Sequence, residues 1–292
     1  MRSSRIGAWG AAAAAVILFL PGLYQVSVSL MAPEEAVAHP PVLVPADPRF
    51  GTYVTAWRDL GLAGLLGTTV ILAVLAAAFQ VLTGSAAAFA LARLRFPGRR
   101  WAVGALPLVA GVPALALLVP RFVVFDAWGW TGGFTALVAP ALVSAGSILF
   151  LYEVFRGLPR EPEEAARMDG AGEWAVFSRV VVPQTRPALA IVAGAAILAQ
   201  WRGLLWPLMV TGRTGPDVVE LGLARRVMDG GGGAAPALLA AGVVVALPAL
   251  AAALWVSSMR ARPWGPHAAG PERQSPVEVS PLTAGPFEHH IL

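Results

Sequence analysis

The chain has 292 residues, of which 57% are hydrophobic and only 13% are charged, whereas ordinary soluble domains are about 25% charged. This balance argues against a soluble domain and favours an integral membrane protein, because each spanning helix needs about 20 apolar residues. All 21 basic residues are arginine and cysteine is absent, which excludes a P-loop lysine, a Schiff base, disulfides and thiolate chemistry.

Neither a metal site nor nucleic-acid binding is expected. The net charge of +4 comes from arginines that flank apolar segments, and they do not form one basic patch. The histidines, which metal and acid–base sites most often use, are scattered outside the apolar segments. They are His39, His267, His289 and His290.

Residues 1–61 are interpreted as a first membrane anchor followed by an outside loop. Arg2 and Arg5 precede the apolar segment Gly7–Leu30. No clear small-x-small cleavage site follows this segment, which favours an uncleaved anchor, and a signal peptide is the alternative. Residues 31–60 are rich in proline and polar side chains, as expected of a loop.

Residues 62–259 form the predicted permeation core, with five further apolar segments. The segments are Leu62–Leu91, Trp101–Val119, Phe134–Phe155, Ala188–Val210 and Pro236–Val256. Residues 260–292 are rich in proline, glycine and glutamate, a composition that predicts a disordered tail.

The arginines predict the orientation. With the N-terminus inside, fourteen arginines fall in inside segments and seven outside, and basic residues gather on the cytoplasmic side of membrane proteins. We therefore expect an all-α integral membrane fold with six transmembrane helices and both termini in the cytoplasm. The charged loop 157–187, between spans four and five, then also lies inside.

A first short helix is expected in this loop, over Pro162–Asp169. Proline is tolerated in a first helical turn, where the carboxylates of Glu163 and Glu164 are also favoured. Gly170 suits the position that follows a helix end.

A second helix is expected over Gly172–Val182, ended by Pro183. Its apolar face would consist of Trp174, Phe177, Val180 and Val181. From these features alone, the loop could be an amphipathic linker on the membrane surface or a docking element for a cytoplasmic partner.

The loop resembles the EAA signature of ABC importer permeases. Its Glu164-Ala165-Ala166 is followed after three residues by Gly170 and after nine more by Val180-x-Val182-Pro183. The stretches Ala86–Arg99, Leu158–Ala171 and Leu205–Leu208 are similar to the branch of carbohydrate permeases related to the maltose and glycerol-phosphate systems. This similarity runs from about Phe50 to Gly212.

The resemblance implies one permease subunit of a binding-protein-dependent importer in the bacterial inner membrane, for a sugar or a related polyol or glycoside. It implies a second, different permease chain, an external solute-binding protein and two cytoplasmic ATPases that bind the ATP and magnesium. This chain would hold no cofactor and no catalytic site. The implied ATPase-coupling residues are Glu164, Ala165, Ala166, Arg167, Asp169, Gly170 and Pro183.

Candidate solute-pathway residues are polar or aromatic and lie in or beside predicted spans. They are Gln80, Gln200, Trp201, Arg202 and Trp206. Arg121 and Arg202 could instead lie at helix ends with their charges in water, and the tryptophans could be interfacial anchors. Where the branch commonly has Asn after the tryptophan at 201, this chain has Arg202-Gly203, so the branch's substrate is not carried over.

Three other functions are considered. An importer permease for another solute class would share the same fold and partners. A secondary transporter usually carries acidic residues within its spans, whereas Glu153 is the only acid near a span interior here. A membrane enzyme would need acid–base groups that the apolar segments lack.

Overall fold

The computed structural model describes residues 17–212, 215–229 and 235–260. Every described element is a helix. A helix over Ile17–Ser29 comes first. It is followed by α2 (Pro33–Ala36), α3 (Gly51–Asp59), α4 (Leu62–Arg93), α5 (Arg99–Gly111), α6 (Leu118–Ala127), α7 (Phe134–Val138), η1 (Ala139–Ala141), α8 (Ala145–Arg156), α9 (Glu161–Met168), α10 (Glu173–Ala175), η2 (Val176–Val181), α11 (Val182–Gln184), α12 (Arg186–Trp201), α13 (Leu205–Val210), α14 (Val219–Met228) and α15 (Ala235–Arg260). The predicted tail after Arg260 lies outside the described residues.

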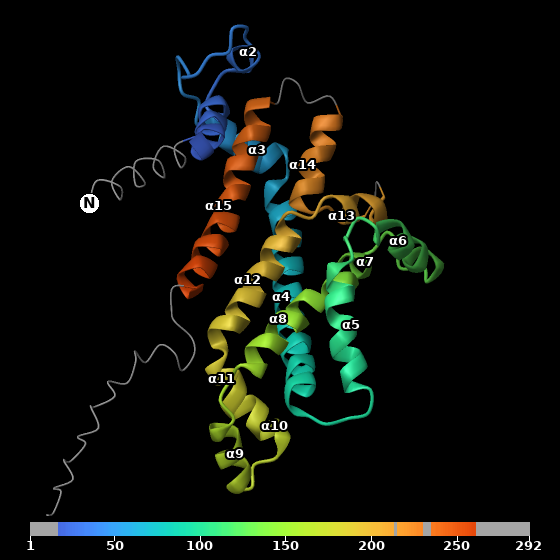
Figure 1. The fold of residues 1–292 in the computed structure, drawn as a ribbon. Helices are drawn as coiled ribbons and strands as arrows, with labels where there is room; N and C mark the ends of the chain where they lie inside the picture. The colour runs from blue at the N-terminus through green and yellow to red at the C-terminus, as the bar shows by residue number, and fades with distance from the viewer. Residues whose placement is uncertain (1–16, 213–214, 230–234, 261–292) are drawn as a thin grey trace, which may run out of the picture. The chain divides into compact units, whose positions relative to one another are not determined.

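The long helix α4 is the element on which the others pack. It contacts α8 and α12 along its length, and α12 in turn contacts α15 (Figure 1). The buried side of α4 is made largely of small residues, including Ala73, Ala76, Gly84 and Ser85. Small residues let helix backbones approach closely in membranes, and a Cβ at Gly84 would lie 3.4 Å from the Leu151 side chain of α8.

By length and hydropathy, three described helices could cross a membrane: Leu62–Arg93, Phe134–Arg156 and Ala235–Trp255. A fourth span arises if Glu173–Gln184 and Arg186–Trp201, which meet at an angle of 79°, count as one. The three helices agree with the second, fourth and sixth predicted segments, whereas the bent pair overlaps the fifth predicted segment only through its second arm, Arg186–Trp201. The total of six spans stays a prediction.

The third predicted span, Trp101–Val119, is not one helix. Helix α5 ends at Gly111 and α6 begins only at Leu118. The break falls at Val112, which is extended (φ −68°, ψ 122°) because the residue before a proline, here Pro113, is driven out of the helical region. The fifth segment is divided in a similar way, since α12 ends at Trp201 and α13 begins at Leu205.

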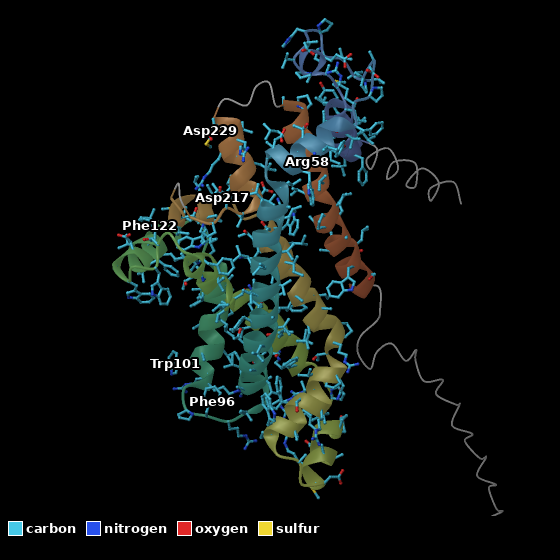
Figure 2. The ribbon with its side chains drawn as sticks, turned by 180° about the vertical axis from the view of Figure 1, so that it is seen from behind. Arg58, Phe96, Trp101, Phe122, Asp217 and Asp229 are labelled. Atoms are coloured by element: carbon cyan, nitrogen blue, oxygen red, sulfur yellow. The ribbon has the colours of Figure 1, made fainter. Side chains whose placement is uncertain are left out.

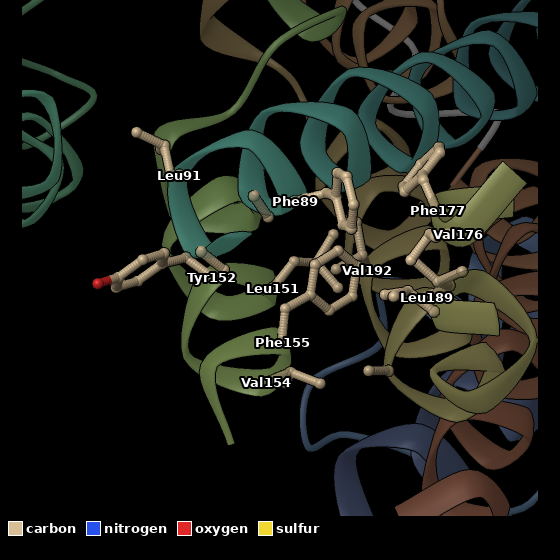
Figure 3. Packing of buried hydrophobic residues seen from close by; sticks show 14 residues of the cluster. Phe89, Leu91, Leu151, Tyr152, Val154, Phe155, Val176, Phe177, Leu189 and Val192 are labelled. Carbon is tan, nitrogen blue, oxygen red and sulfur yellow. The ribbon is translucent and has the colours of Figure 1, made fainter. Parts of the chain in front are cut away.

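A hydrophobic cluster joins the C-terminal half of α4 to α8, η2 and α12 (Figure 3). Phe155 is fully buried in it, and the rings of Phe89 and Phe177 lie 5.2 Å apart between centroids. Because Phe177 belongs to the charged loop, the loop is packed onto the long helices and is not a free linker. Two further clusters involve the opposite half of α4.

Candidate functional site

Helix α9 divides into an exposed face and a buried face. Glu164 and Ala165 are exposed, and Met168 is 89% exposed. On the other side Glu163 is only 1% exposed and Ala166 packs against the hydrophobic cluster. The helix therefore presents two of the three EAA residues outward, and the third lies at the edge of the core.

The local sequence explains where α9 begins and ends. Proline and three carboxylates occupy its first turn, and the helix covers Glu161–Met168, within one residue of the expectation at each end. Gly170 has φ +83°, a value that only glycine adopts at low cost. The turn predicted at this glycine is confirmed.

The second predicted helix is confirmed as helical but differs in form. Residues Val176–Val181 make a π-helix, and the N–H of Val182 donates to the carbonyl of Phe177, five residues earlier. Residues five apart share one side of a π-helix, and Val176 and Val181 are accordingly both buried. Trp174, which the sequence places on the apolar face, is 70% exposed.

Pro183 was predicted to end this helix, and that is wrong. The helical run continues through Pro183 to Gln184, and the chain bends by 79° only between Gln184 and Arg186.

A buried ion pair fixes α9 to α4. The Nε of Arg93 donates to both carboxylate oxygens of Glu163, at 2.7 and 3.0 Å, and its Nη2 donates to the carbonyl of Leu158 at 3.2 Å. The side chains of Arg93 and Glu163 are 3% and 2% exposed. Removing one partner of such a pair would leave an uncompensated buried charge, which is costly.

This pair is absent from the residues selected by sequence. From the sequence, Glu163 is expected only to favour the helix N-terminus, as its acidic neighbours do. The sequence does hold an indication that Glu163 is buried, because Glu163 and Ala166 are three residues apart and share a helix face. If Ala166 faces the core, Glu163 does so too and needs a buried partner.

Arg167 completes a small charge network at the same place. Its guanidinium donates two hydrogen bonds to Glu173, at 2.9 and 3.0 Å, and lies 3.6 Å from Glu163. The hydrogen bonds to Glu173 raise the pKa of Arg167 above its usual value, against a smaller lowering by burial. Arg167 is thus engaged within the chain, whereas the sequence suggested that it would offer its charge to a partner.

One predicted pathway residue, Gln80, lines a cavity of about 340 Å³ between α4, α8 and α12. Its amide donates to the carbonyl of Ala141 at 2.9 Å and accepts from the hydroxyl of Ser147 at 2.9 Å. Ser144 and Ser147 also line this cavity, and neither was selected from the sequence. A side-chain amide and two hydroxyls in an otherwise apolar lining can hydrogen-bond a polar solute.

The other pathway candidates are not among the residues that line this cavity. Gln200 and Trp206 line a small void of about 60 Å³, and the Nε1 of Trp206 donates to the carbonyl of Ala136 at 2.8 Å. The guanidinium of Arg121 lies 5.4 Å from the Trp206 ring centre. Arg202 is exposed at the end of α12.

Trp201 is buried between helices. It is 5% exposed, and its Nε1 donates to the carbonyl of Val245 in α15 at 3.0 Å. Elsewhere in the molecule, the described residues include no cluster of three His, Asp or Glu side chains that could hold a metal ion.

The chain is similar to transport proteins in sequence. A family model described as "Binding-protein-dependent transport system inner membrane component" matches residues 80–261. The chain is 32% identical over 241 residues to the diacetylchitobiose uptake system permease protein NgcG of Streptomyces coelicolor, which covers 80% of this chain and 78% of that protein. It is also 32% identical over 171 residues to the trehalose transport system permease protein SugB of Mycobacterium tuberculosis, covering 58% of this chain and 62% of that protein.

The fold is similar to that of a solved transporter. One chain of a bacterial ABC transporter involved in the import of the acidic polysaccharide alginate superposes with a TM-score of 0.78. The match covers 88% of this chain and 98% of that chain at 21% sequence identity. The described helices therefore have the all-helical fold of a membrane permease.

Proposed function

This chain belongs to the family of binding-protein-dependent transport system inner membrane components, and from that premise we propose that it imports a sugar or a related polyol or glycoside. The chain is a permease subunit of the inner membrane and not an enzyme. The proposed solute class is supported by the relatives, whose names specify diacetylchitobiose and trehalose. The alternative is a permease of the same kind for another solute class.

The proposed arrangement follows the sequence. Residues 1–61 form an anchor and an outside loop, residues 62–259 form the rest of a six-span core, and the tail 260–292 lies in the cytoplasm with the N-terminus. Loop 157–187 also faces the cytoplasm. The proposed partners are a second, different permease chain, an external solute-binding protein and two ATPases, which bind the ATP and magnesium.

We assign coupling to the exposed face of α9. The observation that carries this assignment is the contrast between its two faces: Glu164 and Ala165 point outward, while Glu163 is held at 2.7 Å by Arg93 of α4. An ATPase that binds the outer face can therefore move α4 through the inner face. Gly170 shapes the turn, Asp169 ends the helix, and Pro183 lies just before the bend between Gln184 and Arg186.

Charge reversal at Glu164 tests this assignment. In a strain that lacks the chromosomal gene, we expect Glu164→Arg to leave uptake of trehalose and diacetylchitobiose at the level of the deletion, because the outer face would repel a basic partner. The control is Glu153→Arg, which reverses the charge of another exposed acid, on α8, where Glu153 pairs with the exposed Arg156. Membrane levels of both variants are compared by immunoblot.

The coupling role of α9 and the proposed solute class would be contradicted by different results. Uptake that survives Glu164→Arg would remove the coupling role of α9. A deletion strain that still takes up every sugar in the panel but loses another solute would remove the solute class and leave the coupling role standing.

For the solute pathway, we propose that Gln80 and the two serines of its cavity contact the passing solute. Gln200, Arg202 and Trp206 lie at and just beyond the C-terminal end of α12, next to Ala199 of the cavity lining, and would contact the solute at a neighbouring point of its path. Trp201 would contribute by holding α12 against α15 through its bond to Val245.

A further inference from the structure

The loop between α4 and α5 borders an open pocket to which the proposed function assigns no role. The pocket has a volume of about 680 Å³. It lies at the C-terminal end of α4, where Arg93 holds α9. Its lining includes three arginines, three aromatic residues and no acid: Arg95, Arg99, Arg100, Phe96, Trp101 and Tyr152.

The positive charge of this pocket is not neutralised by the described part of the chain. None of the three arginines lies within salt-bridge distance of a described carboxylate. Arg99 is fixed in place, since its Nε donates to the carbonyl of Leu91 at 2.6 Å and its Nη2 to that of Ala92 at 3.4 Å. Arg95 and Arg100 are exposed and remain available for an anion.

Gly98 positions these groups. Its φ of +83° turns the chain back so that Arg99 lies across the end of α4 and α5 begins beside it. A residue with a Cβ adopts this conformation only at a cost. The glycine at position 98 therefore fixes the turn that places Arg99 and Arg100 beside the pocket.

The aromatic residues give the pocket an apolar side. Phe96 and Trp101 are 41% and 72% exposed and lie beside the connection between α4 and α5 (Figure 2). The guanidinium of Arg100 lies 5.3 Å from the Trp101 ring centre, and the Tyr152 hydroxyl points away from the hydrophobic cluster (Figure 3). The exposed apolar surface continues along α5 through Leu108 and Val109.

We propose that this pocket binds the headgroup phosphate of an anionic phospholipid. Arginine forks match phosphate oxygens, basic pockets between membrane helices suit anionic headgroups, and the tryptophan suits the membrane interface. The acyl chains would lie along α5, which has no buried residue. A free phosphate ion would use the arginines alone and leave this apolar surface uncovered. With both termini in the cytoplasm, as proposed above, the lipid would come from the cytoplasmic leaflet. The opposite orientation would change the leaflet but not the site.

Native mass spectrometry of the full-length chain in detergent micelles tests the proposal. Dioleoyl phosphatidylglycerol is titrated in, with dioleoyl phosphatidylcholine as the neutral comparison. The double variant Arg95→Gln/Arg100→Gln should weaken phosphatidylglycerol binding about 30-fold, because each arginine near an anionic lipid contributes roughly fivefold. Arg99 is left intact because it holds the end of α4.

The matched control is Arg156→Gln/Arg186→Gln, which removes two exposed arginines outside the pocket. We expect it to bind phosphatidylglycerol as the wild type does, with thermal midpoints alike in all three proteins. Equal weakening in the control would mean that only net charge matters and would overturn the site. Equal affinity for phosphatidylcholine, or complete displacement of the lipid by inorganic phosphate, would overturn the lipid as its ligand.

Discussion

Arg93 and Glu163 show what a single buried pair does in this chain. Each side chain is almost fully removed from solvent, and the carboxylate accepts two hydrogen bonds from one Nε. Desolvation of two charges is expensive, so such a pair is weak evidence for stability, but three hydrogen bonds from Arg93 to Glu163 and Leu158 join the two helices at this point. Here the geometry is the position of α9 relative to α4.

Removing only Arg93 should lower the stability of the protein more than replacing both Arg93 and Glu163. We expect Arg93→Ala to lower the free energy of unfolding by about 3–5 kcal/mol, because Glu163 would be buried without a partner. The double variant Arg93→Met/Glu163→Met should regain most of this loss. Thermal midpoints in detergent, followed by tryptophan fluorescence, provide the measurement. A double variant no more stable than Arg93→Ala would show that the pair is not the source of the loss.

At the scale of elements, the sequence predicted α9 and its turn at Gly170 because short-range chemistry decides both. Proline, acidic residues and glycine act within one or two turns of their own position. The π-helix was not predictable in this way. A wide turn depends on what the helix packs against, and Val176 and Val181 are both drawn into a cluster formed by other helices.

A contact between α4 and α14 likewise could not be predicted from the sequence. Thr69 of α4 is 1% exposed, and its hydroxyl accepts a 2.9 Å hydrogen bond from the N–H of Val219, the first residue of α14. The first N–H groups of a helix have no partner within the helix. A threonine 150 residues away in the chain therefore caps α14.

Thr69→Val tests the cap between helices. Valine has nearly the same shape but cannot accept a hydrogen bond, so the N–H of Val219 would be buried without a partner. We expect a loss of about 1–3 kcal/mol, measured as a lower thermal midpoint. Thr68→Val is the control, since Thr68 is only partly buried and its hydroxyl bonds within its own helix. Equal midpoints for the two variants would contradict the cap.

At the scale of the whole molecule, hydropathy predicted the helical membrane class and the family followed from one loop signature. The exact division into spans did not follow, because prolines and short polar breaks divide helices without changing average hydropathy. Pro113 ends a helix inside an apolar segment in this way. The candidate pathway was the least predictable, since Gln80 meets Ser147 only when α4 and α8 are packed together.

The cavity at Gln80 leads to a prediction about transport by the whole system. Ser147→Ala removes one hydroxyl from the lining without adding volume. If solute passes there, the maximal uptake rate should fall about fivefold, as expected for one lost hydrogen bond of about 1 kcal/mol. The half-saturating concentration should stay unchanged, because the proposed external binding protein sets it.

Thr83→Val is the matched control for that experiment. Thr83 lies less than one turn from Gln80 on α4, but its hydroxyl bonds to the carbonyls of Phe79 and Leu142, and it does not line the cavity. Similar uptake rates for Ser147→Ala and the wild type would remove the cavity from the pathway.

The ion pair between α4 and α9 also has a consequence for biosynthesis. Arg93 and Glu163 are 70 residues apart in the chain, and ribosomes add about 5–20 residues per second. For roughly 4–14 seconds after its synthesis, Arg93 has no Glu163 to pair with. During that interval its charge holds the end of α4 at the aqueous surface, and the same arginine becomes a buried internal contact only when α9 arrives.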